Sequence, residues 1–387
     1  MVTLLLIIIY ISFISLGLSD SLLGSAWPVM HGELGIPATY AGVISMTIAA
    51  GTITSSLMSD RLTKRLGTRL VVVLSVCLSC AALLGFSFAG SFLVVWLWAL
   101  PYGLGGGALD ATINNYVAVN YKSRHMNWLH CFWGVGAMTG PYVMGFYLTR
   151  GFEWTAGYRT AAIAQMALIA LLIASFPLWK REKQPAAGSP PAKVKPFSEI
   201  INIPGVKHVL LAFFAYCAVE ATAGLWASTY LMSHRGIGAE TAAGFASLFF
   251  IGITAGRFLS GFISGRLGNA GMIKLGLGFI FAGIVLVWLP MQPDMVSLVG
   301  LVVIGLGCAP VFPAIIHSTP GRFGQENSQA LVGLQMASAY TGSALVPPLF
   351  GLVAGVAGMG IYPVFLLVFA GLLVLMTMIK PRGAAVG

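Results

Sequence analysis

Residues 16–27 of the chain read LGLSDSLLGSAW, and residues 216–227 read YCAVEATAGLWA. Each stretch is largely apolar, carries one acid at its fifth position, Asp20 or Glu220, and has a glycine four residues later. The offset between the two copies is 200 residues. An acid repeated inside an apolar segment indicates that the chain is built from two copies of one unit.

Three further motifs recur at nearly the same offset. The pairs are Arg65-Leu66-Gly67 with Arg266-Leu267-Gly268, Gly103-Leu104-Gly105 with Gly305-Leu306-Gly307, and Gly136, Pro141 and Gly145 with Gly342, Pro347 and Gly351. Their offsets are 201, 202 and 206 residues, so the two copies drift very little against each other. Parallel repeats of this size in a hydrophobic chain are typical of transporters that bind their substrate near the bilayer midplane, between two half-domains.

The composition places the chain in a lipid bilayer. Of its 387 residues 58% are hydrophobic and 8% are charged, whereas roughly 25% are charged in soluble domains. Apolar runs of about 20 residues predict membrane helices. The expected helices cover residues 4–30, 38–58, 70–90, 92–118, 129–149, 159–179, 207–232, 240–264, 271–290, 295–317, 329–355 and 360–379. We therefore expect an all-α membrane protein with twelve transmembrane helices in two pseudo-symmetric six-helix bundles.

A polar stretch in the middle of the chain separates the two expected bundles. It is rich in proline, glycine, serine and lysine, which is typical of a flexible linker. We expect an N-terminal bundle at residues 1–180, a cytoplasmic linker at 181–206 and a C-terminal bundle at 207–387. Residues 198–201 are expected to start a short surface helix.

Lysine and arginine are distributed unevenly over the expected loops, and this bias predicts orientation. Of the 21 such residues only Arg150, Arg159 and Arg235 fall on one side, and the others, Arg257 among them, are assigned to the other side. The bias predicts a multi-pass protein of the cell membrane with both termini in the cytoplasm. It also explains most of the net charge of +10, so no nucleic-acid partner is needed.

Three acids lie far from the ends of the expected helices: Asp20, Asp110 and Glu220. An ionised carboxylate costs at least about 2.5 kcal/mol at the centre of a membrane helix, so each acid needs a function or a partner. A buried carboxyl group that exchanges a proton with water or substrate is what a proton symporter requires. We predict that these three couple transport to protons. The alternative for each is a polar anchor that is hydrogen-bonded to a neighbouring helix.

Polar and aromatic side chains near these acids suit a neutral polyol, because amides bind hydroxyl groups and flat rings cover C–H faces. The predicted substrate-binding residues are Asn114, Asn115, His130, Trp27, Trp133, Trp226, Gln335 and Tyr340. The alternative interpretation of Trp27 is a residue of the aromatic belt at the membrane interface. The alternative interpretation of His130 is a residue that only forms a hydrogen bond between helices.

Glycine and proline mark two helices as points of movement. Gly136 and Pro141 in the first half match Gly342 and Pro347 in the second. Glycine permits close helix packing, and proline removes a helical hydrogen bond. We predict a gating function for these four residues. The first pair also resembles a glycine–proline motif of antiporters.

Two six-helix halves joined by a basic loop resemble the major facilitator superfamily. Residues 60–69 and 261–268 are similar to its cytoplasmic signature G-x-x-x-D-R-x-G, with Lys64 and Gly265 at the aspartate position. A narrower resemblance is to the fucose–galactose–gluconate proton symporter branch and its sodium-dependent glucose transporter relatives. It is carried by residues 109–115, 127–136, 216–220 and 311–313. This resemblance implies sugar transport, with Asp20 and Asp110 at the branch's acidic positions.

The sequence therefore predicts a secondary active transporter of a small hydrophilic solute, a monosaccharide first, by proton symport and alternating access. One alternative is a proton-driven exporter of amphipathic compounds. Another is sodium-coupled sugar transport, with Ser19 and Asp20 as sodium ligands. A third is a membrane receptor or an enzyme without transport.

The enzyme alternative has little support in the sequence. The glycine-rich run at 103–107 precedes no lysine and lies within an expected membrane helix. We therefore expect no enzymatic activity, no cofactor and no metal site. We expect the transporter to act as a monomer.

Overall fold

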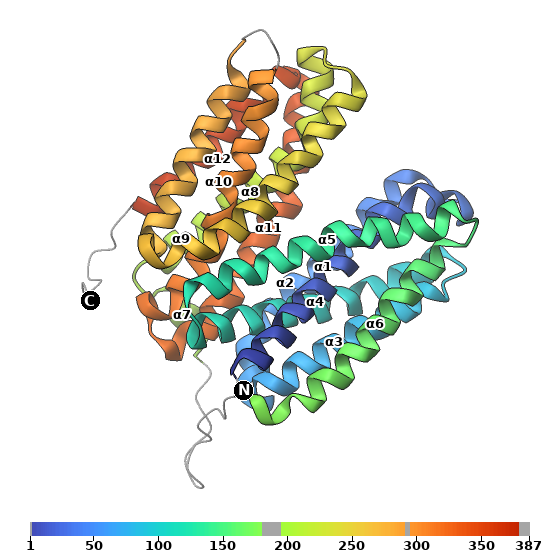
Figure 1. Cartoon of the computed structure of the whole chain (residues 1–387), viewed down its shortest axis with the longest axis vertical. Coiled ribbons are helices and arrows are strands. Elements are labelled where there is room, and N and C mark those ends of the chain that lie inside the picture. Colours follow the sequence, from blue (N-terminus) through green and yellow to red (C-terminus); the bar gives the residue numbers. More distant parts are fainter. Residues whose placement is uncertain (1, 180–194, 291–294, 379–387) are drawn as a thin grey trace. The chain divides into compact units, whose positions relative to one another are not determined.

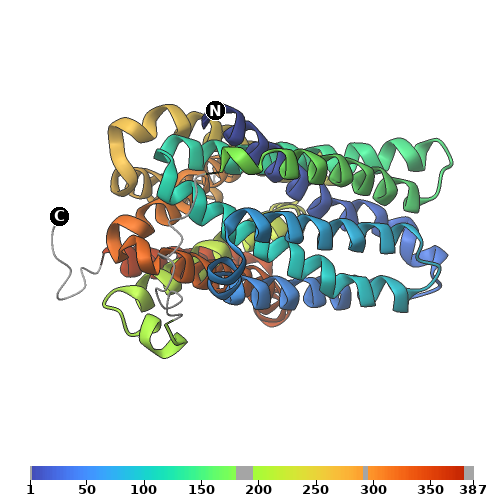
Figure 2. The ribbon, with the colours of Figure 1, turned by 90° about the horizontal axis from the view of Figure 1, so that it is seen from below.

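The computed structural model describes residues 2–179, 195–290 and 295–378, and every regular element in these ranges is helical (Figure 1). The first half contains α1 (Val2–Glu33), η1 (Ala38–Tyr40), α2 (Ala41–Leu66), α3 (Thr68–Ser87), α4 (Phe92–Asn120), α5 (Ser123–Thr149), α6 (Trp154–Ala174) and η2 (Phe176–Leu178). The second half contains α7 (Phe197–Ile201), α8 (Val206–Arg235), α9 (Ala239–Trp288), α10 (Met295–Phe323), α11 (Gln325–Ala357), η3 (Met359–Ile361) and α12 (Tyr362–Met378). Figure 2 shows the same helices from a second direction.

The element α9 is two membrane helices joined at Gly268. This glycine has φ 64° and ψ 173°, which is not helical, and it interrupts 50 residues that are otherwise continuous. Gly67 has φ 79° and ψ 152° at the equivalent place between α2 and α3. Only glycine adopts such positive φ values without a steric cost. The repeated Arg-Leu-Gly motif is therefore a repeated turn, and α9 counts as two of the twelve predicted helices.

By length and composition, ten helices in the described ranges are able to cross a membrane. They are α1 to α4, α6 and α8 to α12, with α2 extended by η1 and α12 by η3. With α9 divided at Gly268, and with α5 at the position predicted for the fifth helix, the twelve-helix fold class is confirmed. The predicted short helix is α7.

Several helices are longer than predicted. α2 continues to residue 66 instead of 58, α5 begins at 123 instead of 129, and α10 continues to 323 instead of 317. α6 keeps its predicted length but is shifted from 159–179 to 154–174. Apolar runs reveal only the part of a helix that lies in the hydrocarbon layer, which is about 30 Å thick. The polar turns beyond that layer carry no such signal, so their extent had to come from the structure.

The chain divides into two compact units by its internal contacts. Unit 1 comprises residues 1–116 and 132–196, and unit 2 comprises 117–131 and 197–387. The end of α4 and the start of α5 thus belong to unit 2, although they precede the linker in sequence. Most of the predicted linker, residues 181–194, lies outside the described residues. The predicted boundaries at 180 and 207 stay a prediction.

Within unit 1, α6 packs against α3 and α1. Its core contains large buried side chains such as Leu22, Phe86, Trp154 and Tyr158. Within unit 2, α10 packs along α9, and α8 packs against α11 and α12.

Equivalent glycines bring equivalent helices into contact in the two units. A Cβ atom on Gly103 of α4 would overlap the backbone oxygen of Ile48 in α2. A Cβ atom on Gly305 of α10 would overlap the backbone oxygen of Phe249 in α9. The two glycines and their two partners recur at nearly the same sequence offset, so the sequence repeat is also a repeat of packing.

Candidate functional site

A carboxylate in the middle of α1 is held by two other helices of unit 1. Asp20 Oδ1 accepts a hydrogen bond from Tyr102 Oη of α4 at 2.8 Å, and Oδ2 accepts one from Trp133 Nε1 of α5 at 3.1 Å. Asp20 is nevertheless exposed. Trp133, predicted to contact substrate, therefore also orients the predicted coupling acid. The sequence analysis missed Tyr102, because this residue is far from Asp20 along the chain and no motif links the two.

The residue before Asp20 has its own partner. Ser19 Oγ accepts a hydrogen bond from Gln165 Nε2 of α6 at 3.2 Å and donates one to the Ser15 carbonyl at 2.9 Å. Ser19 and Gln165 are both buried. Gln165 Oε1 has no hydrogen-bond partner among the described residues.

The second predicted coupling acid of unit 1 lies in α4. Asn114 Nδ2 donates to Asp110 Oδ1 at 2.8 Å and to the Asp110 carbonyl at 3.0 Å. Both side chains are buried, and Asn114 is fully so. The two residues therefore share one helix face, as the spacing of four indicates. The neighbouring Asn115 is half-buried.

Glu220 of α8 is the predicted coupling acid of unit 2, and it lies beside a buried arginine. Arg257 Nη2 of α9 is 3.6 Å from Glu220 Oε2. The same oxygen accepts a hydrogen bond from Tyr216, one turn earlier in α8. Tyr216 Oη also lies 2.9 Å from the carbonyl of Cys308 in α10. Glu220 thus belongs to a polar cluster that joins α8, α9 and α10.

Arg257 corrects the sequence analysis, which assigned it to the cytoplasmic side with the loop residues. It is 3% exposed and lies inside α9. A positive charge at this depth is costly, which makes Arg257 a candidate functional residue. The same argument that singled out Glu220 applies to Arg257, so the sequence did carry a signal for it.

Aromatic rings surround the same cluster in unit 2. The ring of Phe312 in α10 lies 4.8 Å from that of His130, 5.0 Å from that of Phe213 and 5.8 Å from that of Tyr216. His130 is 5% exposed and comes from the first turns of α5. The structure thus brings His130 and Glu220 into one neighbourhood through Phe312 and Tyr216.

Two of the predicted binding residues are part of helix contacts. Gln335 of α11 and Thr319 of α10 exchange hydrogen bonds of 2.9 and 3.1 Å, and both are fully buried. Trp226 Nε1 of α8 donates to the Pro347 carbonyl of α11 at 2.9 Å. Trp226 therefore connects α8 to the predicted gating segment.

The remaining predicted residues are more scattered. Trp27 Nε1 donates to the Ala38 carbonyl at 2.8 Å, so it fastens the end of α1 to the following turn. Tyr340 is half-buried, and Pro141 is exposed.

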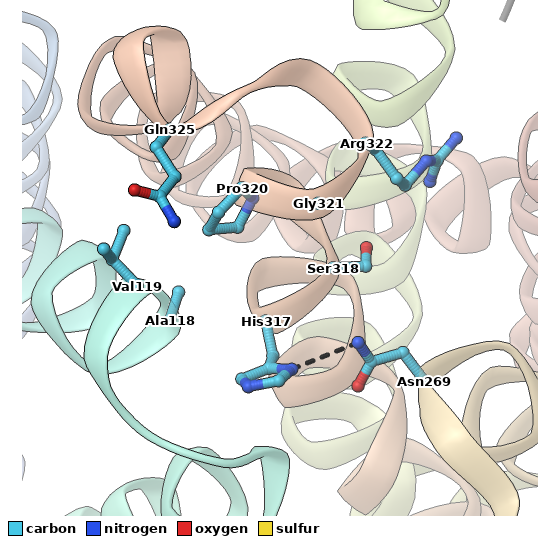
Figure 3. A pocket seen from close by; sticks show the side chains of 9 residues that line it. All are labelled: Ala118, Val119, Asn269, His317, Ser318, Pro320, Gly321, Arg322 and Gln325. Carbon is cyan, nitrogen blue, oxygen red and sulfur yellow. Dashed lines mark hydrogen bonds between the residues drawn. The ribbon is translucent and has the colours of Figure 1, made fainter. Parts of the chain in front are cut away.

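Segment 117–131 is fixed within unit 2 by a chain of hydrogen bonds. Ser123 Oγ donates to Asn269 Oδ1 at 3.1 Å, Asn269 Nδ2 lies 3.1 Å from His317 Nδ1, and His317 Nε2 lies 3.0 Å from the Tyr121 carbonyl. Figure 3 shows His317 pointing toward Asn269 at the edge of a pocket of about 470 Å³. The pocket is lined by Ala118, Val119, Asn269, His317, Ser318, Pro320, Gly321, Arg322 and Gln325.

The same segment inserts a tryptophan into a gap in α9. Trp128 Nε1 donates to the Phe258 carbonyl at 3.3 Å, and its ring lies 5.6 Å from that of Phe262. A Cβ atom on Gly261 would overlap the indole. Only a residue without a side chain leaves room for Trp128 here.

The chain belongs to the Major Facilitator Superfamily, whose family model matches residues 9–328. Bypass of stop codon protein 6 of Saccharomyces cerevisiae is 25% identical over 411 residues, which cover 96% of this chain and 81% of that protein. The hexuronate transporter of Bacillus subtilis is 24% identical over 274 residues, which cover 66% of this chain and 64% of that protein.

Solved structures show the same fold. The outward conformation of the transporter FucP matches with a TM-score of 0.80 at 14% identity, and the match covers 96% of this chain and 97% of that one. A second structure of FucP, the E. coli fucose:proton symporter, matches with a TM-score of 0.77 at 16% identity and the same coverage. Together with the family match, the membrane helices make the chain a multi-pass membrane transporter and not an enzyme.

Proposed function

We propose that this transporter carries a small hydrophilic solute, a monosaccharide first, together with protons by alternating access. The fold neighbour FucP is a fucose:proton symporter, and a distant relative is a hexuronate transporter. Both observations support a sugar-like substrate. The proposal includes a location in the cell membrane, both termini in the cytoplasm and action as a monomer.

The observation that carries the proposal is the Asp20 cluster. Asp20 is exposed within an apolar helix, and Tyr102 and Trp133 each hold one of its oxygens. An intramembrane acid with this arrangement is a candidate for proton transfer. An indole beside it offers a flat surface to the C–H face of a sugar. The Asp20 cluster thus supplies a carboxyl group for proton transfer and an indole ring for sugar binding.

The other predicted residues take proposed roles within their own units. Asp110 and Glu220 join Asp20 as proton-coupling acids. Substrate binding is assigned to Asn114, Asn115, His130, Trp27, Trp133, Trp226, Gln335 and Tyr340. Gating is assigned to Gly136, Pro141, Gly342 and Pro347.

The test is uptake by the purified protein in proteoliposomes. D-glucose, D-galactose and L-fucose are offered with a pH gradient, with a sodium gradient or with neither. We expect at least one sugar to accumulate with the pH gradient alone, and Asp20→Asn to abolish accumulation. Glu153→Gln, at an exposed loop position, serves as the control. Accumulation with sodium alone would favour the sodium-coupled alternative, with Ser19 beside Asp20.

The aromatic cluster of unit 2 favours a second candidate, proton-driven export of amphipathic compounds. The half-buried ring of Phe312 packs on the buried rings of Phe213 and Tyr216, and Tyr216 lies beside Arg257. Phe312 is therefore the ring of this cluster that an apolar compound would contact. If cationic dyes are extruded along a proton gradient while no sugar binds, the exporter replaces the symporter.

A further inference from the structure

Gln165 of α6 faces the hydroxyl group of Ser19, the residue that precedes the predicted coupling acid of α1. Its Nε2 donates to Ser19 Oγ at 3.2 Å. Ser19 gives its own proton to the Ser15 carbonyl at 2.9 Å. The Ser19 oxygen is therefore left as an acceptor, so the amide group must present its nitrogen to it. The positive end of the amide dipole thus lies against Ser19.

The carbonyl end of the same amide group has no such contact. Gln165 is 4% exposed, and its Oε1 is a buried atom without a hydrogen-bond partner among the described residues. A buried acceptor without a partner costs stability. Methionine is an unbranched side chain of similar length and would fill the same space without this cost. The glutamine therefore indicates a role for the N–H group at Ser19 beyond packing.

Tyr102 of α4 connects Ser19 with Asp20. Its hydroxyl group donates to Asp20 Oδ1 at 2.8 Å and also interacts with the Ser19 side chain. The side-chain oxygens of Ser19, Asp20 and Tyr102 therefore lie close together. Carboxylate and other uncharged oxygen atoms are the ligands that hard metal cations take in proteins. This group of oxygens thus contains the ligand types of a sodium site.

Asp20 carries the charge that either a proton or a metal cation would neutralise. Its two hydrogen bonds come from the uncharged groups of Tyr102 and Trp133. Among the residues that the structure describes, no ion pair includes Asp20. A proton binds to a single carboxylate oxygen, whereas a metal cation needs several oxygen ligands at once. Only the metal cation therefore requires the Ser19 oxygen to be open.

We propose that Gln165 selects the coupling ion: its amide N–H group occupies the Ser19 oxygen and excludes sodium, so that Asp20 exchanges protons only. This inference rests on the proposed proton symport. A sodium ion at Ser19 would meet the positive end of the N–H group and would have to break its hydrogen bond. A proton reaches Asp20 at its exposed side and needs neither Ser19 nor Gln165. Gln165 thus acts through Ser19, as a residue that determines ion specificity.

The binding test reverses the polarity of residue 165. Gln165→Glu replaces the N–H group with a carboxylate oxygen, which gives sodium a further ligand beside Ser19. Thermal unfolding of the purified protein is followed as sodium chloride replaces choline chloride at constant ionic strength. We expect sodium to stabilise Gln165→Glu with an apparent affinity at least tenfold higher than for the parent. Gln325→Glu, which adds a carboxylate at an exposed position of α11, should respond as the parent does. An equal response of the parent and Gln165→Glu overturns the inference.

Two further variants locate the ion and cover a failure to fold. Sodium should not stabilise the double variant Asp20→Asn/Gln165→Glu, because the Asp20 carboxylate is missing; a retained sodium response contradicts the inference. Gln165→Met removes the N–H group and the stranded carbonyl together and adds no charge. If Gln165→Glu does not fold, Gln165→Met decides the question. Sodium should then stabilise Gln165→Met at lower concentration than the parent, and an unchanged sodium response shows the inference to be wrong.

Transport separates this inference from the proposed function. In proteoliposomes the parent should accumulate sugar with a pH gradient and not with a sodium gradient, whereas Gln165→Glu should accumulate it with a sodium gradient. Sodium-driven accumulation by the parent, or accumulation by Gln165→Glu with the pH gradient alone, overturns the inference and leaves sugar transport intact. If no variant accumulates sugar with either gradient, the proposed function fails. The sodium response of thermal unfolding then still decides whether Gln165 excludes sodium.

Discussion

Gly136 and Gly342 make the same contact in the two units. A Cβ atom on Gly136 of α5 would overlap the backbone oxygen of Ile14 in α1, and one on Gly342 of α11 would lie 2.5 Å from that of Phe214 in α8. Ile14 and Phe214 occupy equivalent positions of the sequence repeat. In each unit, the glycine of one helix therefore packs against the backbone of the helix that carries the acid.

This contact predicts a loss of stability on adding one methyl group. Gly136→Ala and Gly342→Ala should each lower the free energy of unfolding by about 1–3 kcal/mol, the usual cost of overpacking. Gly145→Ala in α5 and Gly355→Ala in α11 are matched controls, because a Cβ atom there meets nothing within 4 Å. Thermal unfolding in detergent measures the difference. Equal melting temperatures for test and control variants would contradict the packing.

Asp110→Asn should abolish accumulation of substrate against a gradient while exchange of substrate across the membrane continues. An asparagine keeps an oxygen acceptor for Asn114 Nδ2, so the 2.8 Å contact is preserved, but it carries no proton to release. Counterflow and gradient-driven uptake in proteoliposomes measure the two activities. Accumulation by the variant would exclude Asp110 as a coupling residue.

Tyr102→Phe should lower the free energy of unfolding by about 1–3 kcal/mol, because it removes a hydrogen bond to the Asp20 carboxyl group. Tyr158→Phe is the matched control, since its buried hydroxyl has no hydrogen-bond partner among the described residues. Chemical unfolding in detergent measures both. If the two substitutions cost the same, Tyr102 does not stabilise Asp20.

Gly261→Ala should displace Trp128 and release segment 117–131 from α9. Gly265→Ala, one turn later, is the control, because its Cβ atom meets nothing within 4 Å. We expect the emission of Trp128 to shift and a cysteine placed at Ser123 to react faster with a soluble thiol reagent in the Gly261 variant alone. Identical reactivity in both variants would exclude the insertion.

Gln335→Ala and Thr319→Val should each cost about 1–3 kcal/mol of stability, because each strands a buried partner. The double variant should cost less than the sum, since the second substitution removes the stranded group. A double-mutant cycle of unfolding measures the coupling. Loss of sugar binding in Gln335→Ala but not in Thr319→Val would add a binding role for Gln335.

The fold was predictable because its signals are local and repeated. Apolar runs indicated the helices, and the glycine motifs indicated the two halves. The partners of the acids were not predictable in the same way: Tyr102 lies 82 residues from Asp20 and Trp133 lies 113 residues from it. Pairing across such distances depends on tertiary packing, which leaves no periodic mark in the chain.

The depth of Arg257 in the membrane, by contrast, was predictable from the sequence. A charge inside the apolar run of α9 carries the same information as the three acids, and this information is lost when Arg257 is counted with the loop arginines. Depth within a helix is the better criterion for such a residue.

The glycine turn at Gly268 has a mechanical consequence. It joins two membrane helices through a single residue of φ 64°, with no loop between them. A connection of one residue cannot lengthen, so the two helices cannot shift independently along their axes. Arg257 lies about three helical turns before this joint. A movement of α9 at the level of Arg257 is therefore passed directly to the next membrane helix, and through its close packing to α10.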